Sequence, residues 1–462
     1  MIKEIVKHSN LDKACKNVQR NRGSSGVDGM SVSHLKEHLK SNRESLVSCL
    51  LDDSYLPQPI LGVVIPKANG KTRQLGVPTV VDRMLQQAVS QVMVQKFEGE
   101  FKDYSYGFRP RKNANQAVLQ SQKYINEGYQ HIVDIDLKNF FDEVEHYVLL
   151  QLIFRKVKCP STLRLIRKWL RAPMQIEGKL VKRRKGIPQG SPLSPLLSNI
   201  ILHELDRELE RLGQKYIRYA DDFSIYAKTK EQAQNMGNSI YKFLKNKLKL
   251  PINLEKSGIR RPVNFELLGF GFVPTYRKGE KGQYQVVVGK KAWRKLKETL
   301  KRITRKTTPI SLTERIKKLK EVQRGWVNYY RMASIHTKLK GIDSWLRNRL
   351  RYCIWHHWKK PDRKRKNLIR LGVEQGMAYA WSRTRMGGWA VAQSPILGTT
   401  ITLKRLRKGA IAHWWNTTLK YLHYLTNRCI REPYVSASGG RGAFRPYLGA
   451  EPSTRCVLCK LF

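Results

Sequence analysis

The segment IRYADDFSI, residues 217–225, constrains the fold of this chain more than any other stretch. Its two adjacent acids stand between apolar runs typical of β-strands, which predicts a hairpin with YADD, residues 219–222, at its tip. Because strand neighbours point to opposite faces, we assign the role of direct metal ligand to Asp221 and a supporting role to Asp222. Turn propensity alone is an alternative explanation for two adjacent acids.

A second acidic strand, HIVDIDL, precedes this hairpin at residues 131–137. Asp134 and Asp136 share one face of it and the apolar residues share the other, so we expect the acids to be presented and the apolar side to pack. Asp136 and Asp221 together would hold a pair of Mg²⁺ ions roughly 4 Å apart for phosphoryl transfer. A turn or helix-capping acid is the competing interpretation of this strand.

Charge indicates the class of partner. The 462 residues include 88 Lys and Arg against 36 Asp and Glu, a net charge of +52. Such self-repulsion predicts a polyanionic partner, nucleic acid, although a soluble charged surface is the simpler alternative.

The chain has neither an apolar run long enough to cross a membrane nor a secretory signal at its start, so we expect no membrane association and an intracellular protein. Seven scattered cysteines fit reduced thiols better than a disulfide framework.

The length favours several domains rather than one. From about residue 35 to 284, helical stretches alternate with short β-rich runs, which predicts a mixed α and β domain. The pattern becomes helical and more basic from about residue 290. It then turns aromatic and basic with Gly breaks past about residue 372, before a tail rich in Gly, Ser and Pro from about residue 435.

Several motifs carry a resemblance to a known family. DIDLKNFFD (134–142), GIPQGSPLSPLLSN (186–199) and YADDF resemble the successive catalytic motifs of reverse transcriptases. Flanking segments make the chain similar, more closely, to group II intron reverse transcriptase-maturases of the bacterial type without an endonuclease: SSGVDG (24–29), IPKANGKTRQLGVPTVVDRMLQQA (65–88), YSYGFRPRKNANQA (104–117), LKLPINLEKSG (248–258), NFELLGFGF (264–272) and RGWVNYYR (324–331).

This resemblance implies an α+β right-hand polymerase with an appended helical thumb. We expect fingers and palm at residues 1–287, a thumb and maturase domain at 288–375, a basic DNA-binding domain at 376–430 and an unassigned tail at 431–462. The implied activity is an RNA-directed DNA polymerase for target-primed reverse transcription that also binds intron RNA to assist splicing and intron mobility. The implied cofactor is two Mg²⁺ ions, with Mn²⁺ as a possible substitute.

The implied partners are group II intron RNA, an RNA template with a DNA primer, target DNA and dNTPs. The implied setting is the bacterial cytoplasm, in a ribonucleoprotein and at the nucleoid. Two alternatives remain: a maturase that only binds RNA for splicing, and a reverse transcriptase of another retroelement class, such as a retron, a diversity-generating element or a CRISPR-linked enzyme.

The resemblance also assigns roles around the nucleotide. Lys67 and Arg73 match the basic pair that grips the triphosphate, a point charge and a planar fork. Gln189 and Gly190 match the part of the motif that lies against nucleotide and template, where glycine permits close backbone approach. Ordinary solvated charge is the alternative for the two basic residues.

Three further residues match roles at the reacting centre. Leu137 matches the position whose backbone carbonyl joins the metal shell, and Phe141 matches the bulky side chain that excludes a ribose 2′-hydroxyl. Lys256 matches the lysine thought to protonate the departing pyrophosphate, a general acid. Core packing is the competing explanation for Leu137 and Phe141, and a plain surface position for Lys256.

The helical region carries less specific signals. Trp326, Tyr329 and Tyr330 fall at helical spacing and fit a core stripe better than a base-stacking platform. The run WKKPDRKRK at residues 358–366 reads as a phosphate track. LLGFG at residues 267–271 resembles the primer grip, or is a plain buried hairpin. A single Cys456/Cys459 pair cannot complete a four-ligand zinc site, so we expect no endonuclease.

Overall fold

The acidic strand and the acidic hairpin lie in one four-stranded sheet of a computed structural model, which describes residues 1–66, 70, 72–275 and 282–402. The chain divides into two compact units, residues 1–265 with 274–284, and residues 266–273 with 285 onward. Each unit is described by itself.

The helices of the first unit are α1 (Ile2–Ile5), α2 (His8–Asn21), α3 (Leu35–Leu51), α4 (Val80–Phe97), α5 (Ala114–Asn126), α6 (Phe140–Glu143), α7 (His146–Val157), α8 (Pro160–Arg171), α9 (Ser194–Arg211) and α10 (Lys230–Phe243), followed by a π-helical turn (Leu244–Leu248) and a 3-10 turn (Pro262–Asn264). Its strands are β1 (Ile60–Pro66), β2 (Thr72–Val77), β3 (His131–Ile135), β4 (Met174–Ile176), β5 (Lys179–Val181), β6 (Lys215–Tyr219), β7 (Asp222–Ala227) and β8 (Gly258–Arg260).

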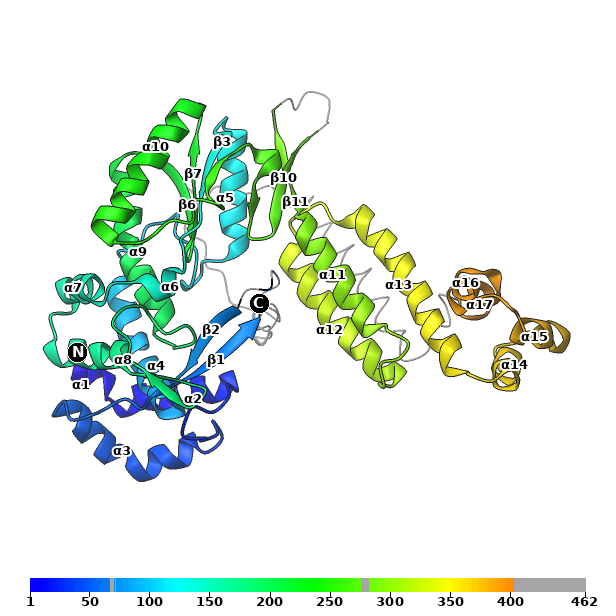
Figure 1. Cartoon of the computed structure of the whole chain (residues 1–462), viewed down its shortest axis with the longest axis horizontal. Coiled ribbons are helices and arrows are strands. Elements are labelled where there is room, and N and C mark those ends of the chain that lie inside the picture. The colour runs from blue at the N-terminus through cyan, green and yellow to red at the C-terminus, as the bar shows by residue number, and fades with distance from the viewer. Residues whose placement is uncertain (67–69, 71, 276–281, 403–462) are drawn as a thin grey trace, which may run out of the picture. The chain divides into compact units, whose positions relative to one another are not determined.

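The sheet that carries the acids has the strand order β6-β7-β3-β8, and its pairings are antiparallel. Helix α10 covers the face that holds Val133 and Ile225; a β-carbon on Gly237 of this helix would lie 3.4 Å from Val133 Cγ1. On the other face, α5 contributes Ser121, whose hydroxyl is 2.7 Å from the hydroxyl of Tyr226. Figure 1 shows α5 and α10 beside these strands. Burial of both faces makes this sheet a rigid support.

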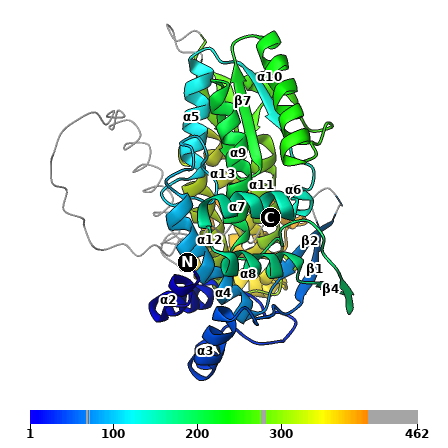
Figure 2. The same ribbon diagram turned by 90° about the vertical axis from the view of Figure 1, so that its left-hand side faces the viewer.

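A second sheet has the order β2-β1-β4-β5. Strands β1 and β2 form an antiparallel hairpin, with Ile65 opposite Arg73, and β4 adds to β1 in parallel. Figure 2 shows β1, β2 and β4 side by side at one edge of the unit. Helix α4 follows this hairpin directly, and the hydroxyl of Thr79 caps it by accepting from Asp82 N.

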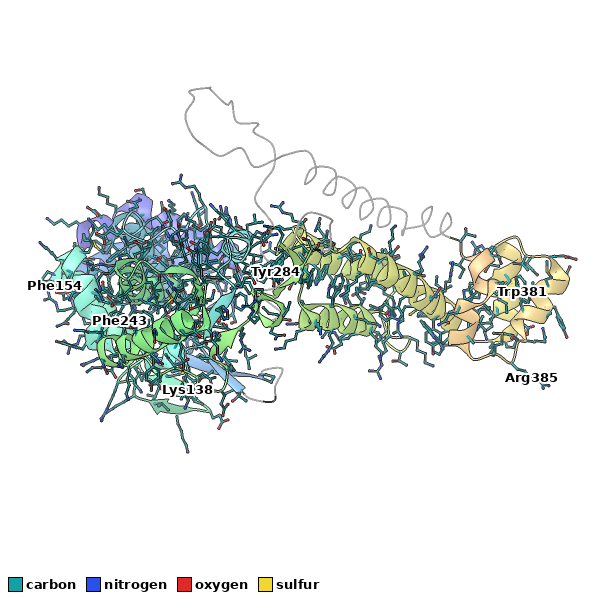
Figure 3. All side chains as sticks on the ribbon, turned by 90° about the horizontal axis from the view of Figure 1, so that it is seen from above. Lys138, Phe154, Phe243, Tyr284, Trp381 and Arg385 are labelled. Carbon is teal, nitrogen blue, oxygen red and sulfur yellow. The ribbon has the colours of Figure 1, made fainter. Side chains whose placement is uncertain are left out.

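The second unit contains β9 (Glu266–Leu267) and all but one end residue of β10 (Phe270–Pro274) and of β11 (Tyr284–Val288). Its helices are α11 (Lys290–Ile303), α12 (Leu312–Tyr330), α13 (His336–His357), α14 (Pro361–Arg370), α15 (Gln375–Ser382), α16 (Gly388–Gln393) and α17 (Pro395–Thr400). Figure 3 labels Trp381 on α15 and Arg385 just after it. A mixed α and β unit followed by helices confirms the predicted α+β class. The predicted domain boundaries stay predictions, and the region 403–462, with the Cys456/Cys459 pair, lies outside the described residues.

Within the described residues, no helix combines the length and apolar character needed to cross a membrane.

Candidate active site

The acidic hairpin forms as its sequence predicts. Tyr219 pairs with Asp222 at the end of the β6–β7 ladder, which leaves Ala220 and Asp221 as a two-residue turn. Ala220 has a φ of +59°, a left-handed conformation that costs energy for a residue with a β-carbon. The turn is therefore strained and needs support from its surroundings.

The acidic strand packs its apolar face as predicted, whereas its acidic face is only partly exposed, because Ile132 on that face is fully buried. Val133 and Ile135 are buried, whereas Asp134 is only half-buried and lies opposite Ser224 of β7. Ile135 pairs with Phe223, so one further step along the same register brings Asp136 beside Asp222. Carboxylates from two strands thus meet at one end of the sheet.

Asp136 is fixed by a segment more than 110 residues away. Asn253 donates from Nδ2 to Asp136 Oδ2 at 2.9 Å, and its backbone NH donates to the Asp136 carbonyl at 2.8 Å. The backbone NH of Asp136 donates to Ser257 Oγ at 3.0 Å. Lys256 Nζ lies 3.2 Å from Asp136 Oδ2, so the predicted general acid and the predicted metal ligand are in contact.

Sequence reasoning missed the holding roles of Asn253 and Ser257, although both belong to the LKLPINLEKSG motif. It also missed Arg260, whose Nε donates to Asp134 Oδ2 at 2.8 Å. This ion pair occupies Asp134, the second acid of the presented face. The alternation of the strand gave equal status to Asp134 and Asp136, and only the partners distinguish them.

Two carboxylates of the site, those of Asp221 and Asp222, have raised pKa values, chiefly because of desolvation. Desolvation, followed by the charges of Asp221, Asp136 and Asp134, raises the pKa of Asp222 to about 7. Desolvation also raises the pKa of Asp221, partly offset by Arg73. Asp222 is exposed to solvent. A cation bound among the acids would relieve the part of its pKa shift that comes from the charges of the neighbouring carboxylates.

The residues predicted for the nucleotide lie on a neighbouring surface. Arg73 of β2 donates from Nε to the side-chain oxygen of Gln189, and the Gly76 backbone NH donates to the Gln189 carbonyl at 2.8 Å. Gly190 has a φ of +119°, and a β-carbon there would lie 2.6 Å from the Gly76 carbonyl oxygen, so only glycine fits. Lys67 lies outside the described residues.

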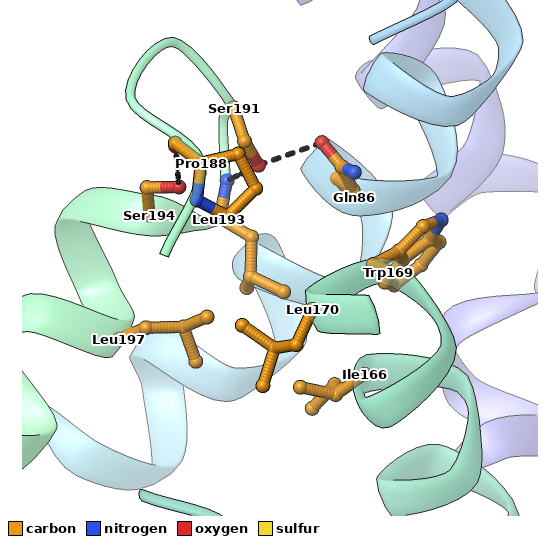
Figure 4. Close-up of a pocket in the computed structure, with 9 residues that line it drawn as sticks. All are labelled: Gln86, Ile166, Trp169, Leu170, Pro188, Ser191, Leu193, Ser194 and Leu197. Carbon is orange, nitrogen blue, oxygen red and sulfur yellow. Dashed lines mark hydrogen bonds between the residues drawn. The ribbon is translucent and has the colours of Figure 1, made fainter. Parts of the chain in front are cut away.

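Two serine hydroxyls hold the GIPQGSPLSP loop in place. Ser191 Oγ donates to Gln86 Oε1 at 2.7 Å, and Ser194 Oγ donates to the Pro188 carbonyl at 2.6 Å (Figure 4). At its start, the Ile187 backbone NH donates to the Phe141 carbonyl at 2.6 Å. Phe141 is half-buried against the core, so its ring has both a packing role and a remaining exposed part.

The donor set fits a divalent cation. Hard oxygen ligands suit Mg²⁺, and Asp136, Asp221 and Asp222 supply carboxylates that repel one another without a cation. The ammonium of Lys256 provides positive charge to Asp136 in this structure. In the part of the chain that the structure describes, no three Asp, Glu, His or Cys side chains already stand in metal-binding geometry. Leu137, predicted to contribute its carbonyl, has a buried side chain and bridges to Ile252.

In the second unit, the aromatic residues of α12 serve the core. Trp326 and Tyr330 are buried and their rings lie 4.6 Å apart, and Tyr330 contacts Phe270 of β10 at 4.9 Å. Tyr329 donates from its hydroxyl to the Leu268 carbonyl at 3.0 Å. These contacts favour the predicted core stripe, and they join the 267–271 segment to α12.

Comparisons with known proteins match two regions of the chain. Residues 65–272 match the family model described as reverse transcriptase (RNA-dependent DNA polymerase), and residues 293–372 match the group II intron maturase-specific domain. The protein YkfC of Escherichia coli is 31% identical over 300 residues, covering 57% of this chain and 78% of YkfC.

This chain covers a smaller share of two other relatives. The group II intron-encoded protein LtrA of Lactococcus lactis is 31% identical over 316 residues, covering 53% of this chain and 51% of LtrA. The chain thus spans about half the length of LtrA. A retron reverse transcriptase of Myxococcus xanthus, Mx65, is 29% identical over 171 residues, covering 35% of this chain and 38% of that protein.

A reverse transcriptase domain followed by a maturase-specific domain distinguishes the intron type from other retroelement enzymes. The order of the two matches, the convergent carboxylates and the homology to LtrA lead to one conclusion. This chain belongs to the family of group II intron-encoded reverse transcriptases and maturases.

Proposed function

We propose that this chain copies RNA into DNA at the carboxylate cluster of Asp136, Asp221 and Asp222, with two Mg²⁺ ions that Mn²⁺ can replace. The observation that carries the proposal is the convergence of these acids at one end of the sheet, where desolvation and then the charges of Asp221, Asp136 and Asp134 raise the pKa of Asp222 to about 7. The metal pair would be held by these acids and the Leu137 carbonyl. When bound, it would activate the primer hydroxyl and stabilise the leaving pyrophosphate.

Residues around the cluster are proposed to bind the incoming nucleotide and to give a proton to the departing pyrophosphate. Arg73, oriented by Gln189, presents a planar fork to the triphosphate. Lys67, which lies outside the described residues, is proposed to add a point charge for the triphosphate. The Lys256 side chain is 64% exposed, so its ammonium can leave Asp136 and give a proton to the departing pyrophosphate.

The second unit is proposed to bind group II intron RNA and so assist splicing and mobility. Its helix α14 carries exposed Arg363 and Lys366, and Lys364 Nζ stands 4.5 Å from the centre of the Trp355 ring. Exposed basic side chains can bind a phosphate backbone, whereas the Trp355 ring is buried and packs against the Lys364 ammonium. Target DNA would be bound by the region beyond residue 376, in a bacterial ribonucleoprotein at the nucleoid.

Primer extension on an RNA template with a DNA primer, dNTPs and Mg²⁺ tests the enzymatic proposal. The comparison is wild type, Asp221→Ala and a matched control, Asp103→Ala, which removes an exposed acid paired with Lys112. We expect extension to be lost in Asp221→Ala and retained in the control. Extension by Asp221→Ala at the wild-type rate would refute the site.

Splicing of a candidate group II intron RNA by the same proteins tests the second function. Splicing that persists in Asp221→Ala would show separate polymerase and maturase surfaces. Splicing without extension by the wild-type protein would favour the alternative, a maturase that only binds RNA.

A further inference from the structure

A buried arginine lies directly behind the catalytic turn. Arg218, on β6, and Asp206, on α9, both have side chains that are 0% exposed. Arg218 donates to Asp206 twice, from Nε to Oδ1 at 2.8 Å and from Nη2 to Oδ2 at 2.6 Å. This bidentate pair neutralises the buried charge in the geometry that a carboxylate and a guanidinium prefer.

The remaining donors of Arg218 connect three segments. Nη2 donates to Ser105 Oγ at 2.7 Å, and Nη1 donates to Asn199 Oδ1 at 3.0 Å and to the Ala220 carbonyl at 2.9 Å. All five guanidinium N–H groups therefore have acceptors. Lysine, with three donors on one nitrogen, cannot reproduce this set.

The bond to Ala220 is the one with a functional consequence. Ala220 holds the left-handed φ of +59° and immediately precedes Asp221. The segment around Gly107 packs against the same turn. Its Gly107 carbonyl accepts a hydrogen bond from Asn199 Nδ2 at 2.9 Å. The buried guanidinium of Arg218 thus hydrogen-bonds both the turn, at the Ala220 carbonyl, and the neighbouring segment, at Ser105 Oγ.

We infer that Arg218 is a positioning residue that fixes the Ala220–Asp221 turn and so sets where the Asp221 carboxylate stands for metal binding. The residue touches neither substrate nor metal. Its effect passes through the Ala220 carbonyl, as outer partners of metal ligands tune a site without binding the ion. This inference rests on the proposed Mg²⁺-dependent copying and adds a residue to it.

The test compares Arg218→Lys with Arg315→Lys in the full chain. Arg315 is an equally buried arginine in the second unit, where it donates to the Ile303, Arg305 and Thr308 carbonyls, so the chemical change and the burial are matched. Single-turnover extension is measured against Mg²⁺ concentration and normalised to active sites. Normalisation removes any loss of folded protein from the comparison.

We expect Arg218→Lys to lower the saturating rate, or raise the Mg²⁺ concentration for half-maximal rate, by about tenfold or more. Arg315→Lys should lower the melting temperature and leave the Mg²⁺ dependence unchanged. A Mg²⁺ profile and rate like wild type in Arg218→Lys would overturn the inference. Wild-type protein without extension would instead refute the proposed function.

A second variant covers the case in which Arg218→Lys does not fold. Arg218→Met combined with Asp206→Leu removes both charges of the buried pair, so no unpaired charge is left, while the Asn199, Ala220 and Ser105 acceptors lose their donor. The double variant should fold, bind primer-template and show the same loss in rate or Mg²⁺ affinity. A double variant with wild-type kinetics would overturn the role of Arg218.

Discussion

Gly107→Ala should inactivate the polymerase without unfolding it. A β-carbon on Gly107 would lie 2.2 Å from Ala220 N, 2.9 Å from the Tyr219 carbonyl carbon and 3.0 Å from Ala220 Cα. All three atoms belong to the backbone of the catalytic turn, so no flexible side chain can yield. Ordinary contact begins at 3.4 Å, so the turn has to move by about 1 Å, a displacement that typically costs about 100-fold in rate.

The assay is single-turnover primer extension at saturating Mg²⁺ and dNTP, with binding of the primer-template measured separately. We expect a rate about 100-fold below wild type, near-normal binding and a stability loss of about 1–3 kcal/mol from overpacking. Gly99→Ala is the matched control in the same unit, because a β-carbon there meets nothing within 4 Å. A Gly107→Ala rate within about threefold of wild type, well short of the expected loss, would refute the argument that this contact sets the turn.

Four further outcomes are expected. Lys256→Arg keeps a positive charge near Asp136 but removes the acid, so the rate at saturating dNTP should fall by about 100-fold or more; a normal rate would show that charge alone suffices. Phe141→Ala should reduce discrimination against ribonucleotides by about 10- to 100-fold in kcat/KM, and unchanged discrimination would favour a packing role. Burial lowers the pKa of His146, whose Nε2 lies 2.8 Å from the Gly186 carbonyl oxygen. The unfolded chain therefore takes up the proton first, and the stability that this histidine contributes is present above about pH 6.5 and lost below it, at up to about 1.4 kcal/mol per pH unit. Chemical denaturation of wild type and His146→Gln between pH 7 and 5 should show this difference, and parallel curves would contradict it. Affinity for intron RNA should fall steeply with salt, because phosphate contacts release counterions, and a flat response in filter binding would argue against the basic surface.

The sequence predicted the parts of the site that depend on local pattern. Strand alternation places Val133 inward and Asp136 outward, and the YADD hairpin follows from two apolar runs around a short acidic turn. These features need only the period of a strand, which the sequence carries directly. The mixed α and β character follows from the same periods, whereas the right-hand polymerase fold was expected from the family resemblance.

The sequence did not predict which distant side chains hold the acids in place. Arg218 reads as one more basic residue in a chain of net charge +52, yet its distant partners come from two other segments, α9 and the loop at Ser105. Asp134 and Asp136 look equivalent along the strand, but Asp134 pairs with Arg260 whereas Asp136 is bound by Asn253 and Lys256. Such pairings arise from tertiary contacts, which no periodicity in a single sequence encodes.

The hold of Asn253 and Ser257 on Asp136 has a consequence for the newly made chain. A ribosome that has completed β7 has already made every predicted carboxylate of the site, but not the segment that fixes the first of them. At about 5–20 residues per second, that segment follows about 2–6 s later. Assembly of the catalytic centre therefore waits for a contact of long sequence separation, the slow kind in folding. Nascent chains that end between Asp222 and Ser257 carry the acids without the full set of contacts that fixes Asp136.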